Sequence, residues 1–360
     1  GNWEIVDVMR GFTADRGYDR LFPNLSNTED ETTKVGVNST GFFSTTAMET
    51  DGATIVYMAI RRGPMATPTA ASSVFDIQNS TTNNPAFTSD NIIDTAMFAN
   101  KGSSDNRYWS FRLGHRGYLY SNATNAEATN QAAWDFGDSQ FGHYHNSGGL
   151  SGYIGYFWKR APSYHDVVAY TGTGSARTVA HNLGVVPEMM WVKRRNNTGS
   201  WNVFHTALGN TKASVLNGTD GSFTSSDFWN NTSPTSSVFT VGTGTGLNGS
   251  GDTYVAYLFA TLAGVSKVGS VSHSGSSTDV DCGFSSGASL VMLKRTDSTG
   301  DWYWWDSTSG IVSGNDPYIL LNTNAAQVTN TDLIDPLSSG FTITGDFTDG
   351  DYIFYAIAAI

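Results

Sequence analysis

The stretch Leu290-Val-Met-Leu-Lys-Arg-Thr-Asp-Ser-Thr-Gly-Asp-Trp-Tyr-Trp-Trp305 reads as a strand, a polar turn and a second strand, the pattern of a β-hairpin. The chain repeats it earlier as Met189-Met-Trp-Val-Lys-Arg-Arg-Asn-Asn-Thr-Gly-Ser-Trp201. Lysine precedes tryptophan by eight positions in both copies, and Lys101 and Trp109 keep this spacing in a weaker third copy. A fourth copy begins at Trp3, because the Gly-Asn-Trp start of the chain matches the end of the turn in the stronger copies. Self-similarity at a fixed period predicts a tandem repeat protein.

The end of each repeat is a short apolar run that closes on a tyrosine. These tyrosines lie 99, 101 and 98 residues apart, at Tyr57, Tyr156, Tyr257 and Tyr355. We therefore predict complete repeats at 63–161, 162–264 and 265–360, preceded by an incomplete first repeat at 1–62. The first repeat starts at the position equivalent to Gly199, so it lacks opening strands and would leave unpaired strand edges. We expect either further chain upstream or a neighbouring subunit to cover it.

Within a repeat the strands are short and alternate with period two, and no segment shows a sustained helical period. This pattern predicts an all-β protein made of tandem antiparallel β-sandwich repeats of about 100 residues, each with its own core. The inward face of the hairpin strand should carry Trp3 and Ile5, Trp109 and Phe111, Trp201 and Val203, and Trp302 and Trp304. The alternate positions should point outwards, and they are Glu4, Ser110, Asn202 and Tyr303. A shorter strand then ends in asparagine, at Asn24, Asn122, Asn217 and Asn322.

The composition indicates a folded protein that neither binds nucleic acid nor inserts into membranes. Aromatic residues make up 13% of the 360 residues, enough for a large core, whereas charged residues make up 14%, about half the usual share. The net charge of −12 leaves no basic footprint for nucleic acid or an anionic membrane. No apolar run has the length of a membrane span. The single cysteine, Cys282, excludes an internal disulfide framework, which favours folding in a reducing cytoplasm.

The stretch from Asn182 to Arg195, with the Ala-Tyr-Thr-Gly-Thr-Gly run that ends at Gly174, resembles a repeat domain of virion-associated proteins in tailed bacteriophages. That family is frequent in phages of marine bacteria and cyanobacteria, and the likeness covers essentially the whole chain. The second repeat departs from it by lacking the Lys-Arg pair, and the fourth has Cys282-Gly-Phe-Ser instead of Asn-Leu-Gly-Val. The resemblance implies a structural or receptor-facing role in the virion and no catalytic residues.

We therefore hypothesise a non-enzymatic structural protein of a phage virion, such as a tail fibre, a tail appendage or a capsid decoration. The expected partners are other copies of the chain, in a homotrimer, together with other virion proteins and a host surface glycan. The expected location is the virion, after folding in the host cytoplasm. No cofactor is expected.

A carbohydrate-binding adhesin is the alternative hypothesis, because flat aromatic side chains stack on sugar faces. Tyr303 and Trp305 fall on the outward face by alternation, and Lys193 and Arg195 would grip an anionic group. The competing interpretation places both aromatic side chains in a core or interface and both cations at a solvated strand end. Exposure of Tyr303 and Trp305 on a shared surface distinguishes the two.

Motifs for metal binding and catalysis are weak. His143 and His145 would share one face of a strand, but no third ligand is evident. The acidic turn at 346–351 lacks the further oxygen ligands of a calcium loop. The Gly-Phe-Ser-Ser-Gly run ending at Gly287 has the spacing of a nucleophile elbow, but a strand instead of a helix follows it. We predict no catalytic and no metal site, although a carboxylate pair brought together by folding, as in a glycan-degrading enzyme, would leave no local pattern.

Overall fold

The computed structural model describes residues 2–7, 18–32, 34–38, 41–44, 54–60, 65–81, 86–114, 117–129 and 150–360. Its secondary structure is almost entirely β, arranged in antiparallel sheets, which confirms the predicted all-β sandwich class. The α-helices of this part are single turns, α1 (Ser226–Trp229) and α2 (Thr245–Asn248). None of the described helices has the length and hydropathy needed to cross a bilayer.

The first repeat contains two small hairpins. They pair β1 (Tyr18–Arg20) with β2 (Asp30–Thr32), and β3 (Val35–Asn38) with β4 (Gly41–Ser44). An isolated antiparallel bridge joins Ile5 to Leu21. The predicted inward strand of this repeat is therefore paired with the strand that ends near Asn24.

The second repeat forms a five-stranded sheet of order β5-β9-β6-β7-β8. Its strands are β5 (Phe75–Asn79), β6 (Thr95–Asn100), β7 (Tyr108–Phe111), β8 (Leu119–Tyr120) and β9 (Tyr153–Trp158). Two single-turn 3-10 helices flank it, η2 (Ala71–Ser73) and η3 (Arg112–Gly114). The closing strand β9 lies between β5 and β6, inside the sheet and not at its edge.

The third repeat places a six-stranded sheet against a two-stranded one. The large sheet, of order β10-β17-β12-β13-β14-β15, consists of β10 (His165–Thr171), β17 (Thr253–Phe259), β12 (Met189–Arg194), β13 (Trp201–His205), β14 (Lys212–Val215) and β15 (Phe223–Thr224). The small sheet consists of β11 (Arg177–Ala180) and β16 (Val238–Val241). The 3-10 turn η5 (Thr206–Leu208) follows β13.

The fourth repeat has the same two-layer plan. Its large sheet consists of β18 (Ser266–His273), β25 (Gly350–Ala358), β20 (Ala288–Arg295), β21 (Trp302–Asp306) and β22 (Tyr318–Leu320), in that order. Its small sheet consists of β19 (Thr278–Asp281), β24 (Gly340–Ile343) and β23 (Ile334–Leu337), in that order. No described sheet combines strands from two repeats.

The three large sheets share one register as well as one topology. The closing strands β9, β17 and β25 each lie between the first strand of their repeat and the first hairpin strand. Across the ladder, Tyr156, Tyr257 and Tyr355 face Met97, Trp191 and Met292 respectively. The tyrosines that mark the repeat in sequence are therefore equivalent in space.

This register corrects the alignment of the second repeat. Trp109 pairs with Met97, which places it level with Val203 and Trp304 in the other two repeats. The alignment of Lys101 with the two lysines was therefore wrong by two residues. In the second repeat, Ala99 occupies the position of the lysine and Arg107 that of the tryptophan, and these two residues are also eight positions apart.

The large sheets are buried on both faces, so the prediction that the alternate positions face solvent is wrong. On β13, Trp201 and Val203 point into a core shared with the second and fourth repeats. Phe204 lies on the opposite face and packs against Trp229, with ring centroids 5.5 Å apart, in a core that belongs to the third repeat alone. Asn202, expected to be exposed, is 97% buried, since only 3% of its surface is accessible. The expectation that each sandwich buries only its own core therefore holds for one face.

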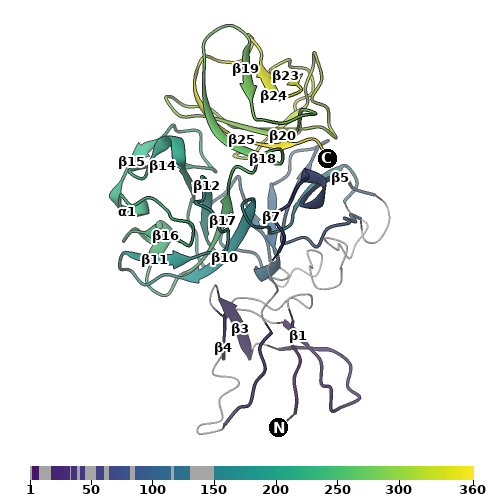
Figure 1. Cartoon of the computed structure of the whole chain (residues 1–360), viewed down its shortest axis with the longest axis vertical. Coiled ribbons are helices and arrows are strands. Elements are labelled where there is room, and N and C mark those ends of the chain that lie inside the picture. The colour runs from purple at the N-terminus through teal and green to yellow at the C-terminus, as the bar shows by residue number, and fades with distance from the viewer. Residues whose placement is uncertain are drawn as a thin grey trace.

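The second, third and fourth repeats surround the shared core, and the first repeat lies below the second and third (Figure 1). Aromatic side chains from the three repeats meet there. Trp109 packs against Trp191 and Tyr257 of the third repeat, with centroids 5.2 and 5.7 Å away. Tyr156 packs against Trp304 of the fourth repeat at 5.6 Å, and Phe259 packs against Tyr355 at 5.0 Å. We call this arrangement the ring.

Candidate functional site

Tyr303 and Trp305, the proposed sugar platform, stack on each other on β21 with centroids 5.4 Å apart and planes inclined by 12°. Trp305 is nevertheless fully buried, and Tyr303 is half-buried. Phe347 covers both rings, at centroid distances of 5.1 and 6.0 Å. Burial raises the pKa of Tyr303 to about 12. The pair lies on the predicted face of the strand, but the core of the fourth repeat covers that face, so it offers no open surface to a glycan.

Lys193 and Arg195, the proposed anion grip, are also buried. The Lys193 Nζ donates to the carbonyls of Thr124 at 3.1 Å and Gly199 at 2.8 Å. The Arg195 Nε lies 2.6 Å from the Glu127 carboxylate. Desolvation lowers the pKa of Lys193 to about 8. The solvated strand end expected here is therefore wrong, because both cations connect the third repeat to the second.

These cations belong to a contact that recurs three times around the ring, which we call the seam. In each seam the hairpin turn of one repeat meets the chain that follows the short strand of another. A backbone N–H of the turn donates to a carbonyl of the other repeat. The three bonds are Gly199 to Thr124 at 2.9 Å, Gly300 to Thr219 at 2.8 Å and Asp105 to Asn324 at 2.8 Å. A second backbone bond runs in the opposite direction, from the other repeat to the hairpin. The three bonds are Glu127 to Arg195 at 2.7 Å, Ser222 to Thr296 at 3.1 Å and Gln327 to Lys101 at 3.1 Å. The third repeat thus joins the second, the fourth joins the third, and the second joins the fourth.

Two side chains reinforce the seam in the third and fourth repeats. The indole Nε1 of Trp201 donates to the Tyr120 carbonyl at 2.7 Å, and that of Trp302 donates to the Val215 carbonyl at 2.9 Å. Lys294 repeats the role of Lys193 by donating to the Thr219 and Gly300 carbonyls, at 2.9 and 2.6 Å. Each of these two seams therefore has one indole donor and one ammonium donor.

Arg107 supplies both kinds of donor in the third seam. Its Nε donates to the Leu320 carbonyl at 3.0 Å, where the other seams use an indole. Its Nη1 donates at 3.0 Å to the Asp105 carbonyl, which is equivalent to the Gly199 and Gly300 carbonyls that the lysines reach. Its Nη2 donates to the Ala325 carbonyl, one residue beyond the Asn324 position that is equivalent to Thr124 and Thr219. Sequence reasoning did not single out Arg107, because neither Ala99 nor Arg107 matches the lysine and tryptophan of the repeat, and only the strand register shows the equivalence.

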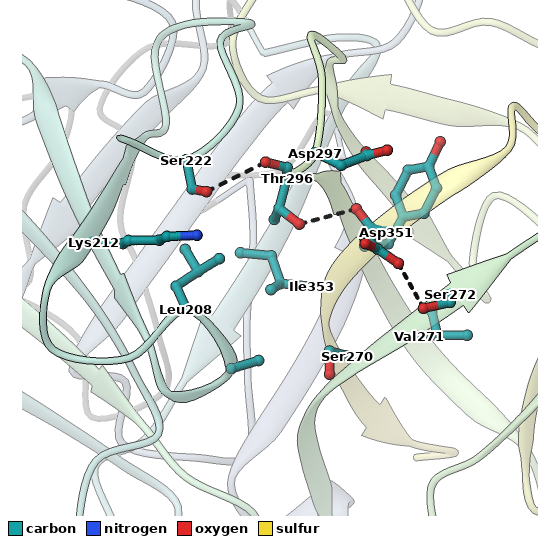
Figure 2. A pocket seen from close by; sticks show the side chains of 12 residues that line it. Leu208, Lys212, Ser222, Ser270, Val271, Ser272, Thr296, Asp297, Asp351 and Ile353 are labelled. Atoms are coloured by element: carbon teal, nitrogen blue, oxygen red, sulfur yellow. Dashed lines mark hydrogen bonds between the residues drawn. The ribbon is translucent and has the colours of Figure 1, made fainter. Parts of the chain in front are cut away.

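An open groove of about 450 Å³ lies beside the seam between the third and fourth repeats (Figure 2). The Ser222 Oγ donates to the Thr296 carbonyl at 3.3 Å, and the Thr296 Oγ1 donates to the Asp351 carbonyl at 3.0 Å. Asp297, another lining residue, pairs with Arg295 at 2.8 Å, and that guanidinium lowers the pKa of the Asp297 carboxyl. Ser222, Thr296 and Asp297 thus each already have a polar partner within the protein.

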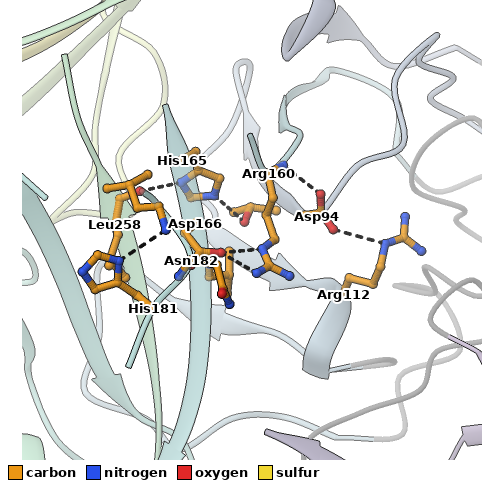
Figure 3. A network of polar contacts seen from close by, with 11 residues as sticks. Asp94, Arg112, Arg160, His165, Asp166, His181, Asn182 and Leu258 are labelled. Atoms are coloured by element: carbon orange, nitrogen blue, oxygen red, sulfur yellow. Dashed lines mark hydrogen bonds and ion pairs between the residues drawn. The ribbon is translucent and has the colours of Figure 1, made fainter. Parts of the chain in front are cut away.

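A buried polar network holds the junction of the second and third repeats (Figure 3). Arg160 donates from its Nε to Asp166 at 2.6 Å and from its backbone N–H to Asp94 at 2.7 Å. The His165 ring lies between the Leu258 carbonyl and the Thr95 hydroxyl, both at 3.0 Å. Because a carbonyl only accepts, His165 Nδ1 carries the proton and Nε2 accepts from Thr95. Burial lowers the pKa of His165 to about 4, so the ring is neutral near pH 7.

The described ranges contain no group of three or more potential metal-ligating side chains. His143 and His145 lie outside the described residues. In the acidic turn, Asp349 accepts from the backbone N–H of Gly275, and Asp351 accepts from the hydroxyl of Ser272 at 2.6 Å. These contacts join the turn to β18 and the residues that follow it.

The first repeat differs from the others in exposing large apolar side chains. Trp3 and Tyr57, whose equivalents in the third and fourth repeats are fully buried, have 64% and 70% of their surface accessible. Met58 and Ile60, further along the closing segment, are still more exposed. Residues 54–60 belong to no described strand, so the segment that carries Tyr57 lies outside the two hairpins of this repeat.

Comparison with known proteins identifies one family. Residues 109–359 match a domain of unknown function, DUF7483. The chain belongs to this family. The match starts in β7 and ends just after β25, so it includes the whole third and fourth repeats of the ring and part of the second. No curated protein and no solved structure matches the chain.

Proposed function

We propose that this chain is a non-enzymatic structural component of a phage virion, such as a tail fibre, a tail appendage or a capsid decoration. The observation that carries the proposal is the ring, in which three repeats of one design close on each other through equivalent seams. The buried cations Lys193, Lys294 and Arg107 serve those seams, as expected for a rigid building block. The resemblance of the 182–195 stretch to repeats of virion-associated proteins supports the same role.

The adhesin alternative loses the platform on which it was based, because Phe347 and the fourth-repeat core cover Trp305. A glycan contact through other residues stays compatible with a structural role in a virion.

The location of the protein tests this proposal. Antibodies raised against the purified chain should label intact particles of the phage that encodes it, at a fixed place on the tail or capsid, in electron micrographs. Mass spectrometry of purified particles should find the chain in constant proportion to the major capsid protein. Its presence only in the particle-free fraction of the lysate would contradict the proposal, as would the release of reducing ends from host polysaccharides by the purified chain.

A further inference from the structure

Strand β18 forms an edge of the large sheet of the fourth repeat, since β25 is the one described strand that pairs with it. The backbone groups of Ser266 and Val268 point away from β25, because they bond to residues 261 and 262 instead, at 2.9 to 3.4 Å. Strand backbones alternate with period two, so Ser270 and Ser272 direct their N–H and C=O groups outward as well. The outer half of this edge therefore offers main-chain donors and acceptors.

In the second and third repeats, the chain itself covers the position equivalent to Ser272. The register that aligns the closing tyrosines makes Thr81 and Thr171 its equivalents. The backbone N–H of Thr81 donates to the Ala86 carbonyl at 2.9 Å. The guanidinium of Arg177 donates to the Thr171 carbonyl. The edges of these two sheets are therefore partly satisfied from within the chain.

The fourth repeat lacks such a partner in the part of the chain that the structure describes. Thr278 occupies the position of Arg177, and its hydroxyl lies 2.9 Å from the Nδ1 of His273. Ser270 and Ser272 are exposed, and both line the open groove between the third and fourth repeats (Figure 2). An unpaired strand edge of this kind is a template for a strand from another chain.

The walls of the groove indicate which side chains such a strand would carry. In the ladder, Ser270 lies opposite Ile353 and Ser272 lies opposite Asp351. Leu208 of the third repeat also lines the groove and points toward Ile353 (Figure 2). Asp351 is exposed, accepts from the Ser272 hydroxyl at 2.6 Å and forms no ion pair within the described residues. The groove is thus apolar beside Ser270 and acidic beside Ser272.

We propose that the β18 edge binds an extended segment of another protein by strand addition. The segment pairs antiparallel with Ser270 and Ser272, whose main-chain bonds supply the affinity. Side chains that pair across a ladder lie on the same face of the sheet, so those opposite the two serines reach the groove. A lysine or arginine opposite Ser272 passes over this small side chain to Asp351, whereas Lys212 lies on the opposite wall (Figure 2). An aliphatic residue opposite Ser270 packs beside Ile353.

The occupant is a single segment of chain and not a second copy of this protein. The groove of about 450 Å³ has room for a short extended segment, whereas a second copy would bring its own third repeat against this one. The net charge of −12 also favours a basic segment over another acidic chain. The inference goes beyond the virion proposal and does not depend on it.

Fluorescence anisotropy of the full chain with labelled peptides tests the proposal. The antiparallel direction places the basic residue two positions before the aliphatic one, so the probe is the peptide Thr-Thr-Lys-Thr-Val-Thr-Thr. We expect saturable binding that weakens about three- to fivefold when norleucine replaces the lysine, as for an exposed ion pair. Methylation of the lysine and valine amide nitrogens removes the donors that face β18 and should raise the dissociation constant about tenfold or more.

Two variants of the protein test the same contacts. Ser270→Pro removes an outward N–H, which an edge strand tolerates, and should raise the dissociation constant about tenfold or more. Asp351→Asn should raise it about three- to fivefold. The matched control is Asp279→Asn, at an exposed carboxylate of β19, which should leave the affinity unchanged. All three variants should keep the circular dichroism spectrum of the parent.

Absence of saturable binding at millimolar concentration would overturn the inference. Unchanged affinity in Ser270→Pro, in Asp351→Asn or for the methylated probe would overturn it as well. If Ser270→Pro does not fold, the methylated probe supplies the same test on the parent chain. Because peptide binding does not depend on where the protein resides, each of the two proposals can fail while the other stands.

Discussion

At the scale of the residue, Arg107 shows how one seam can be formed with different chemistry. The third and fourth repeats use an indole and an ammonium group on neighbouring strands. The second repeat has Ala99 where they have lysine, and the guanidinium of Arg107 reaches the carbonyl that the indole would have served and one of the two that the lysine would have served. The planar fork of arginine, with donors in several directions, makes this possible. Desolvation lowers the pKa of Arg107 to about 10, which still leaves it charged near pH 7.

Arg107→Lys should therefore destabilise the protein, although it conserves charge. A single ammonium group cannot reach both the Leu320 and the Asp105 carbonyls, so at least one buried acceptor is left without its donor. We expect the free energy of unfolding to fall by about 1–3 kcal/mol, measured by urea denaturation. Arg194→Lys is the control, because Arg194 forms a partly exposed pair with Asp252 and its replacement should cost less than about 1 kcal/mol. Equal losses in the two variants would contradict the role assigned to Arg107.

His165 should make the protein sensitive to acid. Its pKa is lowered by burial to about 4 in the fold, against about 6.5 in an unfolded chain. The unfolded state therefore binds the proton more readily between these values, so stability is fully present above about pH 6.5 and falls as the pH drops towards 4. The loss attributable to this group is about 3 kcal/mol.

His165→Gln keeps a donor and an acceptor near Leu258 and Thr95 but does not titrate. Urea denaturation between pH 4 and 7 should show a shallower pH dependence of the free energy of unfolding for this variant than for the parent. His205, also neutral because burial lowers its pKa to about 4, should supply much of the slope that is left. An unchanged slope in His165→Gln would show that this ring does not carry the predicted proton linkage.

At the scale of the element, the hairpin strands are covered on both sides. Val203→Asp would place an unpaired carboxylate in the shared core, and Phe204→Asp would place one in the core of the third repeat. Each should lower the free energy of unfolding by about 3–5 kcal/mol. Thr178→Asp, at an exposed position of β11, should change it by less than about 0.5 kcal/mol. If only one of the two strand variants is destabilised, the sheet is covered on one face only.

The strand positions and their alternation could be predicted from the sequence, but what covers each face could not. Period two placed Trp201 and Asn202 on opposite faces correctly, yet the pattern does not say whether a second layer lies over the polar-looking side. The same alternation placed Trp305 on the outward face, but Phe347, which lies more than forty residues further along the chain, packs against it. Arg107 was missed because a repeat search rewards identical residues, and here a different side chain serves the same carbonyls.

At the scale of the whole molecule, the repeats are distinct in sequence, but three of them share one hydrophobic core and should depend on one another for stability. The closing tyrosines Tyr156, Tyr257 and Tyr355 occupy equivalent positions, and each large sheet is built from strands of one repeat. The shared core instead combines Trp109, Tyr257 and Trp304 from three repeats. Sequence alone could not show this, because the contacts that close the ring join residues far apart in the chain.

The shared core is tested most directly by differential scanning calorimetry of the full chain and of Trp201→Ala. Removing this buried indole and its bond to the Tyr120 carbonyl should cost about 3–5 kcal/mol. Because the second, third and fourth repeats bury one core together, we predict that they melt in a single transition and that the variant shifts all of it to lower temperature. Three resolved transitions, of which Trp201→Ala moves only the one from the third repeat, would contradict the account.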